Sequence, residues 1–569
     1  MAYRAPVAEF RFILEHVAGL PDVVATERFA EATDDVTAAI LDGAGRLCDE
    51  VLAPLQRPGD LHPARLENGV VRTSPGYAEG YRAIAEGGWV ALSAPPEHGG
   101  MGLPTALSTA VNDMMSGACL SLQLNPLLTQ GQIEALCHHA SDEIQALYLP
   151  RLIAGDWSGT MNLTEAQAGS DVGALKTRAV PNGDGTYAVT GQKVYITWGD
   201  ADFMENVIHL VLARLPDAPE GTRGISLFLV PRNLPDADGR PGVANGVKVV
   251  SLEHKLGLHG SPTALMEFDG ATGWMVGAPN KGMAGMFTMM NNARLGVGAQ
   301  GVGVAEAAFQ QALAYAGERR QGPTPMGDGP IVGHADVRRM LAGMKAEIFA
   351  ARAIALSCAV AADMAEASGE PDWAARAAFL TPIIKAWGTE VGMEVAQQGV
   401  QVHGGMGFIE ETGAAQYLRD VRVTAIYEGT NGIQAMDLVG RKLGDGGEAA
   451  WRLLEEVEQT AEAAREVFPD LAGDLWTAAE ALREATEWML TREMTDRFAG
   501  AVPFLRAWAR VLGAHLHLTA ALAEGGEGPR SALARVFIRR MLPEHASALA
   551  AARAGAGDLY ELSDAALSA

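Results

Sequence analysis

Residues 285–301, GMFTMMNNARLGVGAQG, distinguish between two fold classes. Residues 296–301 satisfy the G-x-G-x-x-G pattern, which indicates a dinucleotide-binding loop when it follows a strand and opens a helix within a βαβ unit. Here the preceding residues read as a helix, and no βαβ unit surrounds the pattern. We therefore interpret Gly296, Gly298, Gly301 and Gly303 as positions where one helix approaches its neighbours closely.

Long helical patterns continue on the C-terminal side of this stretch. Apolar residues recur at helical spacing over residues 281–320, 335–367 and 374–405. Helices of this length, joined by short loops, are typical of a bundle. The stretch LGDGGEAA, residues 443–450, reads as a linker before a further helical pattern. The expected core of that last segment contains Trp451, Trp476, Trp488 and Trp508.

The N-terminal side has a different composition. The chain up to about Asp156 reads mostly helical, and it is followed by short runs rich in Val, Ile, Thr and Gly between turn clusters. No long helix separates these runs, so we expect an antiparallel sheet. The sequence thus predicts an α+β protein with an N-terminal helical domain (1–157), a central antiparallel β-domain (158–276), a C-terminal four-helix bundle (277–443) and an additional helical domain (447–569).

Charge and cysteine content exclude several classes of function. The 569 residues carry a formal net charge of −25, which opposes binding to nucleic acid or to an anionic lipid surface. The four cysteines form no CxxC pair or Cys/His cluster, so neither a zinc site nor a disulfide framework is expected. The N-terminus lacks the apolar core of a secretory signal, and no window suggests a membrane span. We expect a soluble cytoplasmic protein.

Two polar positions are candidates for chemistry. Ser170 lies in AGSDVG, but it lacks the G-x-S-x-G frame of a serine hydrolase and suits phosphate or amide binding better. Glu428 stands between the apolar stretch 424–427 and the turn formers 429–432. Apolar burial raises the pKa of a carboxyl group and makes it a candidate general base. The alternative is a carboxylate stabilised by the amide dipoles at the start of the following helix.

The order and spacing of several segments are more specific than any one of them. The chain resembles the acyl-CoA dehydrogenase family across roughly residues 1–443, and its last domain resembles the longer bacterial branch that includes methylmercaptopropionyl-CoA dehydrogenases. The segments that carry this resemblance are MNLTEAQAGSDVGALKTRA, KVYITWGD, HKLGLHGSP, NNARLGVGAQGVGVAEAAFQQALAYAGERRQG, QQGVQVHGGMGFIEETGAAQYLRD and IYEGTNGIQ.

The resemblance implies an FAD cofactor held between the β-domain and the helical bundle, often with residues of a second subunit. Thr164 would bind the pyrimidine side of the flavin, Thr197 would lie near N5, and Tyr195 would pack on the ring. The remaining positions implied to bind the cofactor are Ser170, Arg319, Gln401, Gly404, Gly405, Thr430 and Asn431. This sequence departs from the family pattern at three positions, Asn162, Ala166 and Trp198. The Trp198 indole is expected to narrow the acyl pocket or to alter access of the electron acceptor.

The resemblance also implies the reaction, in which an acyl-CoA thioester is dehydrogenated to a trans-2-enoyl-CoA. Glu428 would abstract the α-proton while flavin N5 accepts the β-hydride. Some family members place the base immediately before the arginine that corresponds to Arg294, but Ala293 stands there in this chain. The positions implied to contact the substrate are Ser170, Asn291, Arg294 and Gly429.

The resemblance further implies a role in fatty acid metabolism, electron-transfer flavoprotein as the electron acceptor and a homodimer. Two alternatives are left open by the sequence. A flavin oxidase or monooxygenase on the same scaffold would be rapidly reoxidised by dioxygen. A non-catalytic assembly protein would use the additional helical domain as a docking surface.

Overall fold

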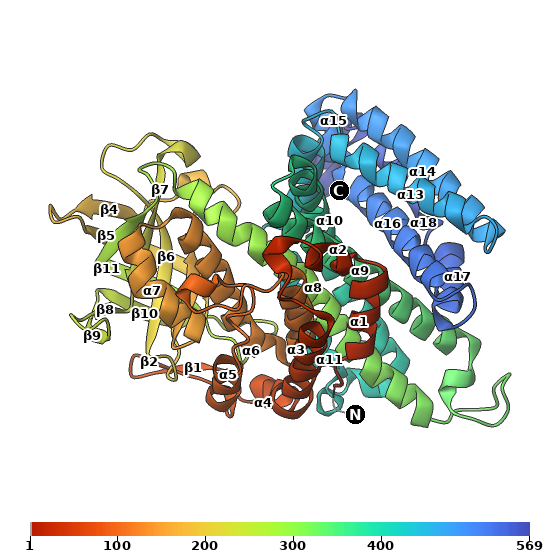
Figure 1. Ribbon diagram of the computed structural model, residues 1–569, viewed down its shortest axis with the longest axis horizontal. Helices are drawn as coiled ribbons and strands as arrows, with labels where there is room; N and C mark the ends of the chain where they lie inside the picture. Colours follow the sequence, from red (N-terminus) through yellow and green to blue (C-terminus); the bar gives the residue numbers. More distant parts are fainter. Residues whose placement is uncertain (1–2) are drawn as a thin grey trace. The chain divides into compact units, whose positions relative to one another are not determined.

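The computed structural model describes residues 3–569, which form two compact units (Figure 1). The helical unit comprises the chain up to Asp42, Pro104–Gly117 and Arg294–Ala569. The sheet unit comprises Gly43–Leu103 and Ala118–Ala293. The chain passes between them at four points: within α3 (Asp34–Arg46), just before α6 (Thr105–His139), within α6, and within α8 (Gly282–Glu318). Helix α6 is interrupted at Cys119, where the backbone leaves helical geometry.

The sheet unit is built on one mixed sheet. Its order is β10-β11-β5-β4-β6-β3, and β7 pairs with both β11 and β6. The strands are β3 (Trp157–Asn162), β4 (Arg178–Pro181), β5 (Tyr187–Thr197), β6 (Asn206–Arg214), β7 (Ile225–Pro231), β10 (Val247–Leu252) and β11 (Thr263–Val276). The core of the sheet contains Val189, Ile196, Phe228, Val230 and Phe268.

The predicted α+β class is confirmed, but the sheet is not wholly antiparallel. Strand β6 pairs in parallel with β3 and with β4, whereas the other pairs are antiparallel. A parallel pair needs a long crossover connection, which is usually a helix. Here β4 and β5 themselves supply the connection between β3 and β6, so the absence of a long helix did not exclude parallel pairing.

Short elements complete the sheet unit. They are α4 (Gln56–Leu61), the antiparallel pair β1 (Arg65–Glu67) and β2 (Val70–Arg72), α5 (Tyr77–Glu86), α7 (Asp142–Ala154), and the pair β8 (Asn233–Pro235) and β9 (Pro241–Ala244). Helix α7 begins after Ser141 and ends at Gly155, whose φ of 79° lies in the left-handed region that glycine tolerates.

The helical unit contains the long helices α8, α9 (Ala335–Ser368) and α10 (Pro371–His403). Its N-terminal helices are α1 (Val7–His16) and α2 (Leu20–Val24). Its C-terminal helices are α11 (Ala414–Val421), α12 (Asn431–Asp437), α13 (Glu448–Ala464), α14 (Pro469–Leu490), α15 (Met494–Ala499), α16 (Ala501–Ala523), α17 (Pro529–Arg540), α18 (Glu544–Ala552), α19 (Gly557–Glu561) and α20 (Asp564–Ser568). Helix α9 has the length and hydropathy of a membrane span, but 83 % of its most apolar window is buried inside the fold.

The glycine stripe of α8 lies against α10. A Cβ atom at Gly298 would lie 2.8 Å from the carbonyl oxygen of Ile384, and one at Gly301 would lie 2.2 Å from that of Gly388. From the other side, a Cβ atom at Gly388 would lie 2.5 Å from the carbonyl oxygen of Gly298. The two backbones therefore touch where no side chain fits, which confirms that the G-x-G-x-x-G pattern serves helix packing.

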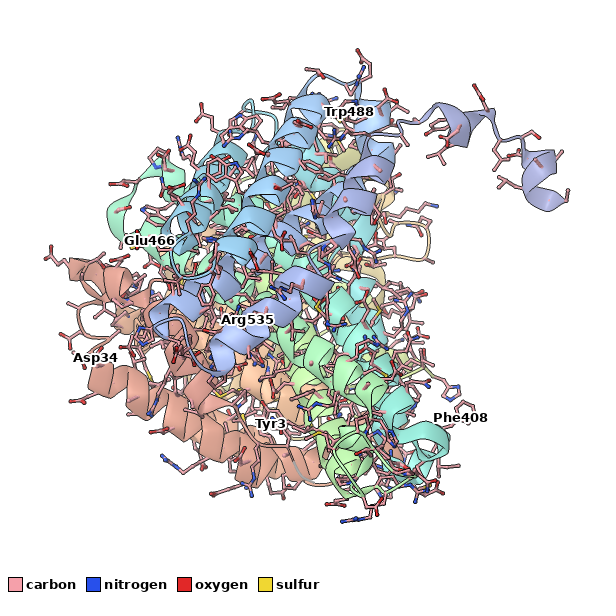
Figure 2. The ribbon with its side chains drawn as sticks, turned by 90° about the vertical axis from the view of Figure 1, so that its right-hand side faces the viewer. Tyr3, Asp34, Phe408, Glu466, Trp488 and Arg535 are labelled. Carbon is pink, nitrogen blue, oxygen red and sulfur yellow. The ribbon has the colours of Figure 1, made fainter. Side chains whose placement is uncertain are left out.

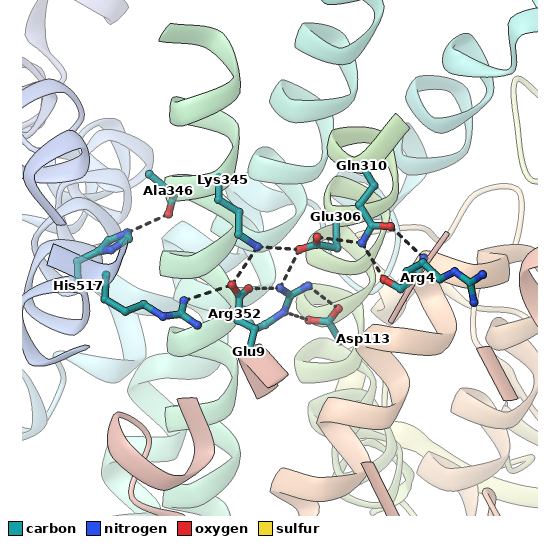
Figure 3. A network of polar contacts seen from close by, with 10 residues as sticks. Arg4, Glu9, Asp113, Glu306, Gln310, Lys345, Ala346, Arg352 and His517 are labelled. Atoms are coloured by element: carbon teal, nitrogen blue, oxygen red, sulfur yellow. Dashed lines mark hydrogen bonds and ion pairs between the residues drawn. The ribbon is translucent and has the colours of Figure 1, made fainter. Parts of the chain in front are cut away.

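A buried guanidinium joins three other parts of the helical unit (Figure 3). The Arg352 side chain of α9 is fully buried and donates to Glu9 of α1 at 2.6 Å and to Glu306 of α8 at 3.0 Å. It also forms two hydrogen bonds, 3.0 and 3.1 Å long, with the Asp113 carboxylate of α6. Burial raises the pKa of Asp113 to about 6, although Arg352 opposes that rise.

Glu9 receives two further cations. Lys345 of α9 lies 2.9 Å from its carboxylate, and Arg530 of α17 lies at 3.3 Å. Burial by itself would raise the pKa of Glu9, but Lys345 and Arg352 lower it to about 2. The C-terminal helices are thus tied to α1 and α9 within one unit.

Of the four tryptophans expected in the core of the last segment, only Trp508 is fully buried. The other three are half-buried, and an arginine lies over each ring: Arg483 over Trp451, Arg465 over Trp476 and Arg492 over Trp488. Figure 2 shows Trp488 near the surface of these helices. An indole can cover a partly exposed surface while it attracts a cation, so tryptophan content alone did not identify the core.

Replacing Gly301 by alanine should destabilise the helical unit, because the new methyl group must displace the α10 backbone. We expect a loss of about 1–3 kcal/mol in the free energy of unfolding, measured by urea denaturation. Gly473, in α14, is the matched control, since nothing lies within 4 Å of its Cβ position. There G473A should stabilise by up to about 1 kcal/mol. Equal effects of the two substitutions would contradict the close approach of α8 and α10.

Replacing Arg352 by methionine should be more damaging, because it leaves buried carboxylates without their counter-charge. We expect a loss of about 3–5 kcal/mol in the free energy of unfolding, with partial recovery in R352M/D113N. Arg339 on the same helix pairs with Asp336 at the surface, so R339M should change stability by less than about 0.5 kcal/mol. A small effect of R352M would show that the buried cluster is not a stabilising element.

Candidate active site

The candidate site in the helical unit is the turn at residues 427–431. Glu428 has φ = 57° and Gly429 has φ = 86°, so two consecutive residues occupy the left-handed region. This conformation is unfavourable for a glutamate and is kept only where surrounding contacts enforce it. A Cβ atom at position 429 would lie 2.8 Å from Gln434 Nε2, so glycine is required there by space as well as by conformation.

The carbonyl groups of this turn point into the protein. The Glu428 carbonyl accepts a hydrogen bond of 3.2 Å from Gln434 Nε2 and a long one of 3.5 Å from Arg294 Nε. The Gly429 carbonyl accepts a hydrogen bond of 2.7 Å from Lys385 Nζ and one of 3.4 Å from Gln434 Nε2. Within residues 3–569 the Glu428 N–H and its carboxylate have no hydrogen-bond partner. The arrangement thus leaves one N–H donor and one carboxylate available to a ligand.

Helices α8 and α10 hold both ends of the turn. The Tyr427 hydroxyl donates to Gln300 Oε1 of α8. The Asn431 amide donates to the carbonyl of Ala386 at 3.2 Å and to Thr389 Oγ1 at 3.1 Å, and both acceptors belong to α10. Asn431 therefore already has a structural role, and its predicted contact with the cofactor stays a prediction.

Thr430 is the N-cap of α12, and its hydroxyl accepts a hydrogen bond of 3.3 Å from the N–H of Ile433. Helix α12 begins at Asn431, so Glu428 lies before the cap and outside the first helical turn. The amide dipoles of α12 therefore do not account for the position of Glu428. The cap leaves the Thr430 hydroxyl proton free to be donated, as its predicted cofactor contact would require.

Burial and charge act in opposite directions on Glu428. Burial raises its pKa to about 7, although the cations Arg294 and Lys385 partly counteract that rise. Arg294 is 6 % exposed, and burial lowers its pKa. A carboxyl group with a pKa near neutrality can accept a proton and release it again, which is the requirement for a general base.

Two expectations about the surroundings of Glu428 have different outcomes. The Ile426 side chain belongs to the apolar stretch 424–427 that was expected to bury Glu428, but it is 51 % exposed. Tyr427, the last residue of that stretch, is half-buried. Ala293, at the alternative position of the base, is 2 % exposed and carries no proton acceptor.

The sheet unit carries the other predicted cofactor residues. Thr164 follows β3, and Thr197 ends β5; both side chains are half-buried, and within the described residues their hydroxyls make no hydrogen bond. Tyr195 is 64 % exposed with φ = 61°, and Ser170 is exposed. Two free hydroxyls beside an exposed aromatic ring are a suitable donor set for the edge and face of a flavin.

Glu165 organises the loop that follows Thr164, and sequence reasoning did not single it out. Its carboxylate accepts hydrogen bonds from the N–H groups of Lys176 and Thr177, at 2.7 and 3.0 Å, and from the Thr177 hydroxyl at 2.6 Å. It also pairs with the fully buried Lys193 at 2.9 Å. Burial alone would raise the pKa of Glu165, but these contacts, led by the charge of Lys193, lower it to about 2. An acid and a lysine 28 positions apart give no local signal.

Trp198 is 1 % exposed and belongs to the core of the sheet unit. Its Nε1 donates to the carbonyl of Ser121 at 3.1 Å, and its ring packs against Tyr77 and Phe203. The expectation that this indole narrows an acyl pocket is therefore not supported, because the ring is enclosed by its own unit.

The remaining predicted positions lie at the surface. Arg319, Gln401, Gly404, Gly405 and Asn291 are exposed. Gly404 has φ = 60°, and nothing lies within 4 Å of a Cβ position at either glycine. Beside them Phe408 is 88 % exposed, and Figure 2 shows it at the edge of the helical unit. Packing within the chain does not explain these glycines, which is compatible with contact to a cofactor or a second subunit.

Family models match almost the whole chain. The matches are "Acyl-CoA dehydrogenase, N-terminal domain" over residues 36–156, "Acyl-CoA dehydrogenase, middle domain" over 160–271, "Acyl-CoA dehydrogenase, C-terminal domain" over 280–443 and "Acetyl-CoA dehydrogenase C-terminal like" over 453–563.

Individual relatives agree with these models. The 3-methylmercaptopropionyl-CoA dehydrogenase of Ruegeria pomeroyi is 45 % identical, and the alignment covers 96 % of this chain and 97 % of the relative. A butyryl-CoA dehydrogenase of Syntrophomonas wolfei is 36 % identical over 72 % of this chain and 70 % of the relative.

Solved structures share the fold. ACDH-11 of Caenorhabditis elegans in complex with C11-CoA has a TM-score of 0.81 at 22 % identity, covering 95 % of this chain and 92 % of that one. An acyl-CoA dehydrogenase of Bacillus anthracis complexed with FAD has a TM-score of 0.74 at 21 % identity, covering 97 % and 92 %. Proteins of this family bind FAD. The chain belongs to the acyl-CoA dehydrogenase family.

Proposed function

We propose that this chain dehydrogenates an acyl-CoA thioester to a trans-2-enoyl-CoA, with FAD as cofactor and Glu428 as the base. The observation that carries the proposal is the turn at 427–431, where the carboxylate and the N–H of one residue make no hydrogen bond to any described residue. The carbonyls on either side of the Glu428–Gly429 bond are engaged with protein donors, so this N–H is held in place.

The two groups suit the two demands of the reaction. The α-proton of a thioester is weakly acidic, so its removal needs a donor at the carbonyl oxygen where negative charge develops. The Glu428 N–H would donate to that oxygen, and the Glu428 carboxylate would take the α-proton. Gly429 would leave the path of the thioester free of a side chain. FAD, when bound, supplies the acceptor for the β-hydride, which no side chain provides.

Thr164, Thr197 and Tyr195 would hold the flavin ring, with Thr430 and Asn431 beside the base. Ser170, Arg319, Gln401, Gly404 and Gly405 would bind the rest of the cofactor. Asn291 and Arg294 would contact the acyl-CoA, as would Ser170. Support for these assignments comes from the free hydroxyls of Thr164 and Thr197 and from the open space at the Cβ positions of Gly404 and Gly405.

The substrate and partners form the finer part of the proposal. The 45 % identical relative is named for a short thioether acyl-CoA, so 3-methylmercaptopropionyl-CoA is the first substrate to test, followed by straight-chain acyl-CoAs. We further propose electron-transfer flavoprotein as the electron acceptor, a homodimeric assembly and a cytoplasmic location. The exposed Phe408 and the glycines beside it would then lie at the subunit contact.

Anaerobic addition of a suitable acyl-CoA should bleach the visible absorbance of the purified FAD-loaded protein. Replacing Glu428 by glutamine should slow that bleaching by about 10²–10⁴-fold, because it removes the general base. The E428Q protein should retain FAD, as measured by its absorbance after gel filtration.

The matched control is E466Q, which alters an exposed carboxylate on the surface shown in Figure 2 and should bleach at the unaltered rate. A flavin that no acyl-CoA bleaches would count against the dehydrogenase, and normal bleaching of E428Q would remove Glu428 from the mechanism.

The bleaching rate should rise with pH through about 7, because Glu428 acts in its ionised form and burial raises its pKa to about 7. The rate at about pH 6 should be roughly one tenth of that at about pH 8, measured by stopped flow at low acyl-CoA concentration. A rate independent of pH over this range would show that a group with a different pKa limits proton abstraction.

A further inference from the structure

Lys385 of α10 is a fully buried lysine next to the candidate base. Its Nζ donates a hydrogen bond of 2.7 Å to the Gly429 carbonyl and one of 3.2 Å to Asn431 Oδ1. Burial lowers its pKa to about 7, while Glu428 opposes that change and Arg294 adds to it. A buried ammonium is costly unless it is compensated, so its position calls for an explanation.

Hydrogen bonding alone does not explain the lysine. Gln434 Nε2, a neutral donor, already donates to both the Glu428 and the Gly429 carbonyls, at 3.2 and 3.4 Å. A neutral donor would therefore suffice to hold the turn. What Lys385 adds is a positive charge on a fully buried side chain, 2.7 Å from the carbonyl oxygen of the residue that follows Glu428.

We propose that Lys385 is a positioning residue that fixes the left-handed turn at Glu428 and supplies a buried positive charge that favours the ionised form of the Glu428 carboxylate. The inference rests on the proposed function in so far as Glu428 is the base. The charged and titratable groups that act on Glu428 come from three elements: Arg294 of α8, Lys385 of α10, and Tyr427 of the turn itself. The charged groups that act on Lys385 are Glu428 and Arg294.

The direction in which the pKa of Glu428 should change follows from the charges around it. Burial already outweighs Arg294 and Lys385, so loss of the Lys385 charge leaves Arg294 to oppose it; the pKa of Glu428 should rise further, and the carboxylate should form only at higher pH. A substitution that keeps the charge should not raise it. A merely structural role would instead lower activity equally at every pH and leave the titration of Glu428 unchanged.

Two substitutions separate hydrogen bonding from charge. K385Q keeps a donor but removes the charge, whereas K385R keeps a charge that cannot be lost. The matched control is T381V, one turn earlier on α10, where the hydroxyl bonds, within the described part of the chain, only to the Ala377 carbonyl and to the Cys358 thiol. Infrared difference titration of the FAD-loaded protein, with E428Q in each background as reference, isolates the Glu428 carboxyl band without turnover.

K385Q should raise the pKa of Glu428 by about one unit or more, and the acidic limb of the bleaching rate should move by the same amount. K385R and T381V should leave the carboxyl titration at or below its original pKa. A K385Q titration within about 0.3 units of the original would overturn the inference. Should K385Q not fold, the arginine variant decides, since a raised pKa in K385R contradicts a role for the charge.

The outcomes keep the two proposals distinct. Normal bleaching by E428Q would refute the proposed base, while the infrared titration would still report on the charge of Lys385. Loss of bleaching in E428Q, together with an unmoved carboxyl titration in K385Q, would keep the base and remove the role of Lys385.

Discussion

The candidate site depends on the close contact between α8 and α10. Gly298 and Gly301 on one helix and Gly388 on the other allow their backbones to touch. Arg294 lies one turn before Gly298, and Lys385 lies one turn before Gly388. The contact therefore places two buried cations at the same turn, one from each helix. A larger residue in the stripe would separate the cations as well as the backbones.

The chemistry of Glu428 follows from a balance between burial and charge. Burial favours the neutral acid, and Arg294 and Lys385 favour the carboxylate, which leaves the pKa at about 7. The left-handed backbone at Glu428 turns its carbonyl towards protein donors and leaves its N–H free. One residue thus offers a donor and an acceptor to the same ligand. The hydrogen bonds around Glu428 hold its backbone in this strained conformation.

Buried ion pairs also connect distant segments within each unit. Arg352 joins α1, α6 and α8 to α9 in the helical unit, and the Lys193–Glu165 pair orders the loop after Thr164 in the sheet unit. Both are buried clusters whose members are far apart in the chain. Their value lies in fixing which segments meet, because removal of one member leaves an unpaired charge inside the protein.

The local sequence pattern by itself determined the succession of helical and β-prone segments, the packing role of the glycine stripe and the choice of Glu428 as a candidate general base. Periodicity and turn chemistry act between near neighbours, so they can be read directly from the chain. Only the tertiary structure decided that β6 pairs in parallel with β3, that Ile426 is exposed, that Trp198 belongs to the core and that Lys385 lies beside the base. Each of these depends on residues distant in sequence, whose burial and charge have meaning only once the chain has brought them together.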